Sequence, residues 1–328
     1  MGMFRAMSKD TSMRGGIDLG GTKIEAIVVD EANEVRGSAR AATPVDGGPA
    51  KVADEMAKVL GEAAEAAKVK PAALAGVGVG SPGDVNDDAG TVANAGNLPD
   101  WAGSYELAKS LRDALGCPVH LGNDVQVATR AESELGAGTD FQSLIMVAWG
   151  TGIGGGIVLD GKPWLGRGAA GEIGHTVVKD GGAHCQCGRR GCLEAYAGRG
   201  SMEARARREV SKGAQTELFT LMERRGRTRL TSSVWAHALE RGDHLAHELI
   251  DRAVHALGVG IASAVNLLDV EAVIIGGGLG VRFGQPMAER IEAAMKPHLF
   301  NDFRPPAVRV AALGDLGGAM GAALLATS

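Results

Sequence analysis

At 328 residues, the chain is long enough to form two domains, or one large domain, with well-buried cores. Hydrophobic residues make up 45% of the chain, aromatic residues only 4%, and there are 50 glycines. This composition excludes a disordered or fibrous protein and favours tight turns that approach a ligand closely. The formal net charge of -5 excludes a general attraction to nucleic acid or to anionic membranes.

The expected compartment is the cytoplasm. The start of the chain, MGMFRAMSKDTSMRGG, has no apolar segment of signal-peptide length, so we expect no secretion. The uncharged run SLIMVAWGTGIGGGIVL from Ser143 is rich in glycine, which favours a buried hairpin over a membrane span. Three of the four cysteines lie close together, and without an export signal this favours a metal site over disulfides.

Strands and helices alternate through the first half of the sequence, which predicts an α/β fold with a largely parallel sheet. Apolar runs between turn residues predict the strands at Gly16–Leu19, Ile24–Asp30, Val35–Ala42, Leu74–Gly80 and Val119–Gly122. Apolar residues at helical spacing predict the helices at Lys51–Lys68 and Tyr105–Leu115.

The pattern then begins again. GTKIEAIVVD from Gly21 and GTGIGGGIVLD from Gly150 share a Gly-Thr-x-Ile turn that follows one strand and leads into another. Two such hairpins suggest two related halves facing one cleft, although so short a match is also compatible with chance.

The second half is expected to be mostly helical from Met202 to Leu268. Its basic clusters, RARR and ERRGRTR, are interrupted by acidic residues and have no interleaved aromatics, so we interpret them as solvated helix faces. Strands are predicted at Glu271–Ile275 and Val308–Ala312, and a helix fronted by glycines at the end of the chain.

Both glycine turns are candidates for binding phosphate, because glycine exposes backbone N–H groups without a side chain in the way. An ordinary hairpin turn is the alternative for each turn taken singly. A third glycine loop, Gly276–Gly280, follows a buried strand, and the three together favour a nucleotide cleft. Beside the first turn, Asp18 is a candidate ligand of a hydrated Mg²⁺ ion. The predicted nucleotide-binding residues are Asp18, Gly20, Gly21, Thr22, Lys23, Gly150, Thr151, Gly152, Gly276, Gly277 and Gly278.

The sequence LGND places Asp124 between a short strand and a helix. An aspartate at this point can simply cap the helix. It can also act as a base at the carboxyl end of a strand, where open α/β sheets bind their ligands. In phosphoryl transfer such an aspartate accepts the proton of the attacking hydroxyl, and the neighbouring Asn123 would bind the same polyol. In the long loop from Gly80 to Trp101, Asn97 offers an amide to sugar hydroxyls.

The segment EIGHTVVKDGGAHCQCGRRGCLE holds a candidate metal site. Cys185, Cys187 and Cys192 supply three thiolates, and His175 a fourth ligand, which is a recognised set for structural zinc. A chance cluster of buried cysteines is the alternative. With four protein ligands, the ion would have no open position for water, which argues against a catalytic role.

These motifs, in this order, resemble the ROK family (repressors, open reading frames and sugar kinases), within the actin-like ATPase superfamily. The resemblance covers residues 15–328 and is closest to bacterial ROK glucokinases. It depends on DLGGTK, GSPG from Gly80, NLPDW, GND, GTGIGGG, EIGH and CQCGRRGCLE. One departure is Asp100 in NLPDW, where the family more often has glycine.

The resemblance implies an actin-like (ribonuclease H-like) fold with an N-terminal α/β domain at 15–123 and a C-terminal one at 124–314. The last helix, at about 315–328, is expected to pack back on the first domain. The residues that match the family's sugar site are Ser81, Asn97, Asn123, Asp124, Glu172, His175 and Glu194. The resemblance also implies that Asp124 is the catalytic base and that structural Zn²⁺ is held by His175 and the three cysteines.

The implied activity is ATP-dependent phosphorylation of a hexose, in the manner of a glucokinase. Another hexose or an N-acetyl sugar as acceptor, and polyphosphate as donor, remain alternatives. The family's repressor branch has an N-terminal DNA-binding domain, and because few residues precede Asp18, a sugar-responsive transcriptional repressor is the less expected alternative. We expect a homodimer or homotetramer, no nucleic-acid partner and no membrane partner.

Overall fold

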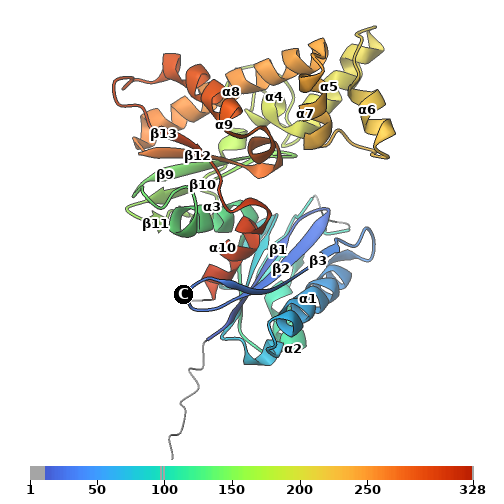
Figure 1. The fold of residues 1–328 in the computed structure, drawn as a ribbon, viewed down its shortest axis with the longest axis vertical. Coiled ribbons are helices and arrows are strands. Elements are labelled where there is room, and N and C mark those ends of the chain that lie inside the picture. Colours follow the sequence, from blue (N-terminus) through green and yellow to red (C-terminus); the bar gives the residue numbers. More distant parts are fainter. Residues whose placement is uncertain (1–11, 97, 99, 327–328) are drawn as a thin grey trace, which may run out of the picture. The chain divides into compact units, whose positions relative to one another are not determined.

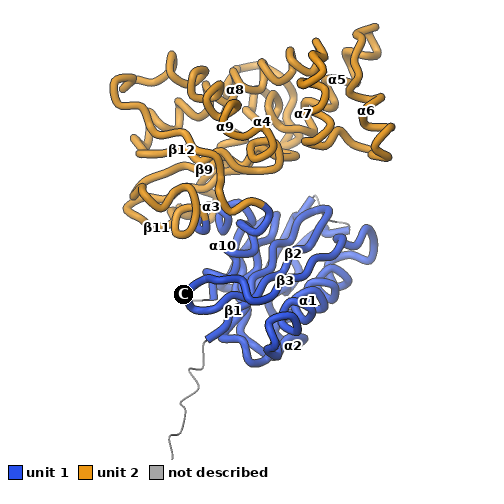
Figure 2. The backbone as a smooth tube through the Cα atoms, in the orientation of Figure 1, with its two compact units in different colours: residues 1–131, 315–328 blue, residues 132–314 orange. Residues whose placement is uncertain are grey.

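The computed structural model describes residues 12–96, 98 and 100–326. The chain divides into two compact units, which are described separately (Figure 2). Unit 1 takes the chain up to Ala131 and again from Asp315, and unit 2 comprises Glu132–Gly314. None of the described helices is both long enough and apolar enough to cross a lipid bilayer.

Unit 1 contains a five-stranded sheet with the order β3-β2-β1-β4-β8 (Figure 1). Its strands are β1 Arg14–Leu19, β2 Lys23–Val29, β3 Val35–Ala42, β4 Val77–Ser81 and β8 Val119–Asn123. Its helices are α1 Gly48–Ala66, α2 Leu107–Leu115, the first turns of α3 Asp124–Leu135, and α10 Gly317–Leu325. A small sheet is formed by β5 Asp84–Asn86, β6 Thr91–Ala93 and β7 Ser104–Tyr105.

The two faces of this sheet are covered by different helices, because side chains alternate along a strand. On β2, Ile24, Ala26 and Val28 belong to the core shared with α1 and α2, whereas Ile27 and Val29 pack with α10. A side chain at Gly16 would collide with the backbone of α10, and Gly78 meets the same helix. Glycines on the sheet therefore let the C-terminal helix, α10, lie directly on the five-stranded sheet of unit 1.

Unit 2 contains a second five-stranded sheet, with the order β11-β10-β9-β12-β13. Its strands are β9 Leu144–Trp149, β10 Ile153–Leu159, β11 Lys162–Pro163, β12 Ala272–Gly276 and β13 Ala307–Val310. Its helices are α4 Glu194–Ala197, α5 Arg199–Ser211, α6 Leu218–Arg224, α7 Ser232–Glu240, α8 His244–Leu268 and α9 Gly277–Met295 (Figure 1). The largest fully buried side chains of its core are Trp149 and Trp235.

The two sheets have the same topology, which supports the inference of two related halves. In unit 1, β1, β2 and β3 form an antiparallel set, and β1 also pairs in parallel with β4, which pairs in parallel with β8. In unit 2, β9, β10 and β11 form the antiparallel set, and β9 pairs in parallel with β12, which pairs in parallel with β13. The prediction of a largely parallel sheet was therefore wrong for half of the strand pairs in the two five-stranded sheets. Short turns join the first three strands, and short turns can connect only antiparallel neighbours.

Two further expectations differ from the structure. The sequence placed the domain boundary at 123/124, but unit 1 continues to Ala131. The start of α3 belongs to unit 1 because Val127 packs closely over Gly80 and Gly122 of its sheet. The expected loop at Gly276–Gly280 is the end of β12 and the first turn of α9, with Leu279 buried in the core of unit 2.

The segments by which the chain enters and leaves unit 2 are held together by one side chain. The carboxylate of Glu132 is buried, and it accepts hydrogen bonds from the backbone N–H groups of Ala312 at 3.0 Å and Leu313 at 2.9 Å. It also accepts one from Ala137 at 2.9 Å. Three backbone donors satisfy the buried charge, so Glu132 joins the two segments that lead to unit 1.

Candidate active site

The first glycine turn joins β1 to β2, as the sequence predicted. The N–H of Gly20 donates to the carbonyl oxygen of Lys23 at 2.9 Å, and the hydroxyl of Thr43 donates to the carbonyl of Gly20 at 2.6 Å. Gly21 and Thr22 at its tip are exposed. The Lys23 ammonium is not directed at the turn: it pairs with Glu25 at 3.2 Å and lies 3.9 Å from Asp315. The turn itself therefore offers backbone donors and the Thr22 hydroxyl.

Asp18 ends β1 in a strongly acidic environment. Its carboxyl group is largely buried and lies against Gly318 at the start of α10, where any side chain would collide with it. Burial, and secondarily the negative charge of Asp124, raise the pKa of Asp18 to about 6. Lys23 acts in the opposite direction, while Glu25 and Asp315 add to the rise. This excess of negative charge fits a site that holds a cation.

Asn123 and Asp124 lie where β8 passes into α3. The Oδ1 atom of Asn123 accepts hydrogen bonds from the N–H groups of Val125 at 3.1 Å and Gln126 at 3.2 Å. Asn123 therefore caps the helix, and its amide nitrogen is the polar atom left to bind a ligand. The role of helix cap, considered above for Asp124, is therefore filled mainly by Asn123. Oδ1 of Asp124 also accepts a hydrogen bond from the N–H of Val125 at 2.9 Å.

Of the other residues predicted in unit 1, Ser81 lies beside Asn123 across the β4–β8 ladder. Its side chain is fully buried, and its hydroxyl donates to the carbonyl of Pro82 at 3.0 Å. Ser81 thus supports the strand end in this structure rather than presenting its hydroxyl to solvent. Asn97 lies outside the described residues.

The second glycine turn joins β9 to β10, and several segments of unit 2 surround it. The N–H of Gly150 donates to the carbonyl of Gly152 at 3.0 Å. Backbone N–H groups at the start of α5 donate to this turn, Arg199 to Gly150 at 3.1 Å and Gly200 to Thr151 at 3.0 Å. Gly277 lies against the end of β9, where a side chain would collide with Trp149. The predicted glycine segments of unit 2 are therefore brought together.

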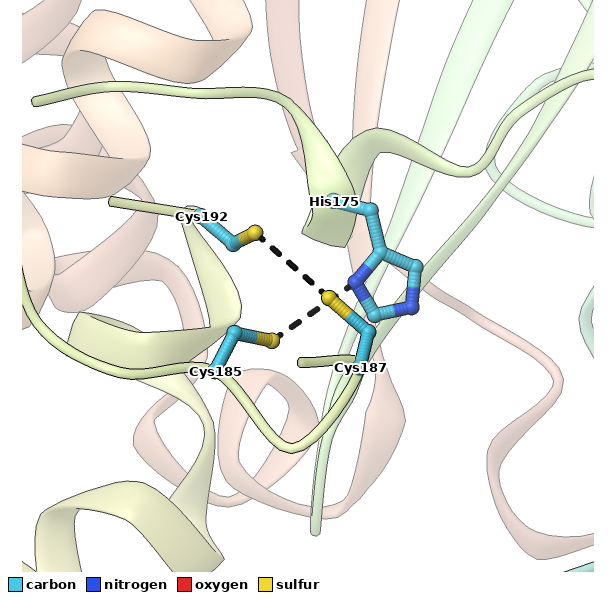
Figure 3. Close-up of side chains that lie close together, drawn as sticks. All are labelled: His175, Cys185, Cys187 and Cys192. Carbon is cyan, nitrogen blue, oxygen red and sulfur yellow. Dashed lines mark hydrogen bonds between the residues drawn. The ribbon is translucent and has the colours of Figure 1, made fainter. Parts of the chain in front are cut away.

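The candidate metal ligands converge as predicted. Figure 3 shows the side chains of His175, Cys185, Cys187 and Cys192 directed at one another, and their ligand atoms all lie within 4.8 Å. The sulfur atoms of Cys187 and Cys192 are 3.8 Å apart, and Nδ1 of His175 is 3.8 Å from the sulfur of Cys185. Tetrahedral zinc with bonds of about 2.3 Å to sulfur separates neighbouring sulfurs by about 3.8 Å. The four side chains therefore fit a zinc ion.

The thiols of this cluster differ in acidity. Burial raises the pKa of Cys185 to about 12 and also raises that of Cys192. A hydrogen bond from the backbone N–H of Arg189 lowers the pKa of Cys187 to about 6. Backbone donors from the loop thus favour a thiolate at the exposed cysteine, which is the form that binds metal.

The two glutamates that bracket the metal loop have different partners, although Oε1 of Glu194 also lies 3.9 Å from the sulfur of Cys185. Glu172 is exposed, and its Oε2 is 4.0 Å from Nε2 of His175, the ring nitrogen that faces away from the thiols. His175 can therefore bind metal through Nδ1 while Nε2 remains available. Glu194 instead contacts the second glycine turn, because its Oε2 accepts a hydrogen bond from the N–H of Ile153 at 2.8 Å.

A role for Arg199 at the second glycine turn was not predicted from the sequence. One of its guanidinium nitrogens donates to the Thr151 hydroxyl at 2.6 Å. The available signal was its position: Arg199 is five residues after Glu194, so a short helix beginning at Glu194 brings it back to the turn that Glu194 contacts.

Comparisons with known proteins bear on this arrangement. The family model described as "ROK family" matches residues 14–328. The chain belongs to the ROK family. It is 33% identical to a glucokinase of Streptomyces coelicolor over 95% of this chain and 96% of that one. It is 32% identical to an N-acetylgalactosamine kinase of a Shewanella species over 94% and 95% of the respective chains.

A solved ROK structure has the same fold. The ROK glucokinase of Streptomyces griseus, in complex with glucose and AMPPNP, superposes with a TM-score of 0.81 at 32% identity, covering 96% of this chain and 99% of that one. This ROK protein therefore has the actin-like ATPase fold, as expected from its motifs.

Proposed function

We propose that this ROK protein is an ATP-dependent hexose kinase of the glucokinase type. The observation that carries the proposal is the pairing of Asp124 with Asp18 in unit 1. Asp124 follows the carboxyl end of β8, and it is close enough to Asp18 at the end of β1 to raise its pKa. One carboxylate placed to accept a proton beside one placed to hold a cation is the arrangement that phosphoryl transfer requires.

In this proposal Asp124 takes the proton from the 6-hydroxyl of the sugar. The hydroxyl oxygen attacks the γ-phosphorus, the bond between the γ-phosphorus and the β–γ bridging oxygen breaks, and ADP leaves with the electron pair. The amide nitrogen of Asn123 donates to a sugar hydroxyl, since its oxygen already caps α3. The hydrogen-bonded cap fixes Asn123, so the neighbouring base is held on a rigid element.

The Mg²⁺ ion implied by this chemistry would be held near Asp18, where it would neutralise phosphate charge. Glu25 and Asp315 add negative potential to the same region, while Lys23 is engaged with both of them. The backbone N–H groups of the two glycine turns are the proposed donors to phosphate oxygens. Unit 1 would therefore supply the base and the cation site.

The zinc site is proposed to be structural. His175, Cys185, Cys187 and Cys192 would fill all four positions of the ion, and so hold the loop that carries Glu172 and ends at Glu194. His175 Nε2 and the two glutamates are the proposed sugar ligands from unit 2. A loop of exposed glycines and charged residues has little packing of its own, so the metal would keep these ligands in place.

The experiment that tests this function is a coupled phosphorylation assay. Glucose, mannose, fructose, N-acetylglucosamine, N-acetylmannosamine and N-acetylgalactosamine are each supplied with ATP or with polyphosphate. We expect turnover with ATP and highest kcat/KM with glucose. Preference for an N-acetyl sugar would instead favour the activity of the Shewanella relative, and no turnover with any pair would contradict the kinase proposal. A cytoplasmic homodimer or homotetramer remains a prediction.

A further inference from the structure

The side chain of Arg199 is a cation without a matching carboxylate. Its guanidinium donates to the Thr151 hydroxyl at 2.6 Å, and it forms no ion pair with any carboxylate in the described part of the chain. Its backbone N–H and that of Gly200 also donate to the same turn. Arg199 is thus fixed against the second glycine turn, with further guanidinium donors available beyond the one bound to Thr151.

A second arginine is held next to it by a buried glutamate. Glu203, on α5, has a buried side chain whose Oε2 accepts hydrogen bonds from Nε of Arg229 at 3.1 Å and from the N–H of Leu230 at 3.0 Å. The Nη2 atom of Arg229 lies 3.8 Å from the position that a Cβ on Gly200 would take. Arg229, from the basic cluster ERRGRTR, is therefore directed at the start of α5.

The guanidinium groups of Arg199 and Arg229 repel each other, because both are positively charged. Burial and the positive charge of Arg229 lower the pKa of Arg199, while the negative charge of Glu203 acts in the opposite direction. Glu203 accepts a hydrogen bond from Nε of Arg229, and this bond does not use the terminal nitrogens of Arg229. The same carboxylate also accepts a hydrogen bond from Arg207 at 2.8 Å. Two like charges at a turn of exposed backbone donors are stabilised when an anion lies between them.

We propose that Arg199 and Arg229 form a binding site for the phosphate chain of the phosphoryl donor, over the turn Gly150–Gly152. The inference rests on the proposed kinase function and deepens it by adding two donor-binding residues. The ligand class is a polyphosphate anion. Two sources share this chemistry, the phosphates of a nucleotide and inorganic polyphosphate, and of these the nucleotide is expected because it is the donor proposed above.

The experiment measures ADP binding without turnover. Arg199→Met and Arg229→Met keep side-chain length but remove the charge, and Arg207→Met is the matched control. Arg207 also binds Glu203, but its guanidinium packs over the Phe219 ring at 4.8 Å rather than toward the turn. Calorimetric titration with ADP in EDTA gives the affinity, and circular dichroism confirms that each variant is folded. Arg199→Lys tests whether charge alone partly restores binding.

We expect ADP affinity to fall about tenfold or more in Arg199→Met, because a charge-assisted hydrogen bond is lost, and by a smaller factor in Arg229→Met. Arg207→Met should remain within about twofold of the wild type, and the KM for sugar should be unchanged in both charge variants. The affinity of the wild type should fall more steeply with salt than that of Arg199→Met, since one ionic contact is missing in the variant.

A folded Arg199→Met protein that binds ADP as tightly as the wild type would overturn the inference. Its failure is distinct from failure of the kinase proposal, because the wild type would still phosphorylate a sugar with ATP. Tripolyphosphate serves as the second probe. If Arg199→Met lost tripolyphosphate binding but kept ADP binding, the nucleotide assignment would be wrong, and the site would belong to an inorganic polyphosphate.

Discussion

The two glycine turns occupy equivalent places in sheets of the same topology, yet the charges around them differ. The turn after β1 follows Asp18 and has Glu25 and Asp315 nearby, while its one lysine is bound by these acids. The turn after β9 is contacted by Arg199 and has Arg229 next to that residue. A repeated hairpin has thus acquired an acidic environment in unit 1 and, in unit 2, one that contains two arginines beside the carboxylate of Glu194.

This difference suggests a division of labour. An acidic strand end attracts a metal cation and provides a base, whereas a basic turn attracts phosphate. Phosphoryl transfer needs both, because the donor arrives as an anion complexed with a cation. The charge difference therefore matches a cation held beside the first turn by Asp18, and a phosphate chain that receives arginine contacts only at the second turn.

The largest effect is expected at the base in unit 1. Asp124→Asn should lower kcat for the sugar by about a thousandfold, because the amide cannot accept the hydroxyl proton. The KM for ATP should change little. Asp113→Asn on α2 is a matched control, since Asp113 is exposed and paired with Lys109. Steady-state kinetics check the prediction, and near-normal turnover in Asp124→Asn would show that another group is the base.

Removal of one zinc ligand is expected to affect the second turn but not the first. Cys187→Ala should lose zinc, raise the KM for sugar about tenfold or more, and speed hydrogen exchange of the Ile153 amide, which Glu194 holds. The amide of Ile24 in unit 1 should exchange as before. Cys117→Ala, which removes the cysteine that is not part of the cluster, is the control for metal content. Loss of metal with an unchanged KM for sugar would contradict the proposed clamp.

The acidic environment of the first turn predicts a stability effect that depends on pH. Because the pKa of Asp18 is about 6 in the folded protein, against about 3.9 for an unperturbed carboxyl, the folded state binds the proton more tightly. Wild-type stability is therefore favoured below about pH 4, declines as pH rises to about 6, and stays lower above that.

Asp18→Asn removes this charge. In EDTA the variant should be more stable than the wild type by roughly 3 kcal/mol at pH 8, and nearly equal to it at pH 4. Urea unfolding at the two pH values measures the difference. Equal stabilisation at both values would show that the charge of Asp18 is not the cause.

A smaller effect is expected at the brace of the second turn. Glu194→Ala removes the acceptor of the Ile153 N–H and should lower the free energy of unfolding by about 1 kcal/mol. Among the residues that the structure describes, no glutamate accepts a hydrogen bond from the equivalent backbone N–H, that of Ile24, in the first turn. Exposed Glu248, on α8, provides a control at Glu248→Ala. Chemical denaturation checks the prediction, and a variant as stable as the wild type would mean that water replaces Glu194 at the turn.

Most of the fold could be predicted because its signals are local. An apolar run between turn residues defines β2, and helical spacing defines α1, so both were found within a few residues of their bounds. The two glycine hairpins were predicted, and with them two of the antiparallel ladders. The expectation of a largely parallel sheet was wrong because the third strand of each sheet also follows a short turn and pairs antiparallel. The first turn of α9 was taken as a loop, since glycines such as Gly277 weaken the helical pattern while tertiary packing buries Leu279.

In the candidate site, too, residues that lie close together in sequence were predicted, whereas contacts between distant segments were not. The four zinc ligands share a short segment with distinctive chemistry, and the structure brings them together. The role of Asn123 as the cap of α3 was not distinguished from that of Asp124, because both are polar and adjacent. Arg199 and Arg229 could not be connected from sequence, since the contact that relates them passes through Glu203 and a tertiary fold.

The comparison of the two turns is tested most directly by titrating ADP into Asp18→Asn and Arg199→Met, each with and without Mg²⁺. The account predicts that Asp18→Asn binds ADP in EDTA at least as tightly as the wild type, but that Mg²⁺ no longer strengthens the binding. Arg199→Met should bind ADP weakly under both conditions while Mg²⁺ still strengthens it by the wild-type factor. The reverse pattern, with the effect of Mg²⁺ lost in Arg199→Met and kept in Asp18→Asn, would contradict the assignment of cation to the first turn and phosphate to the second.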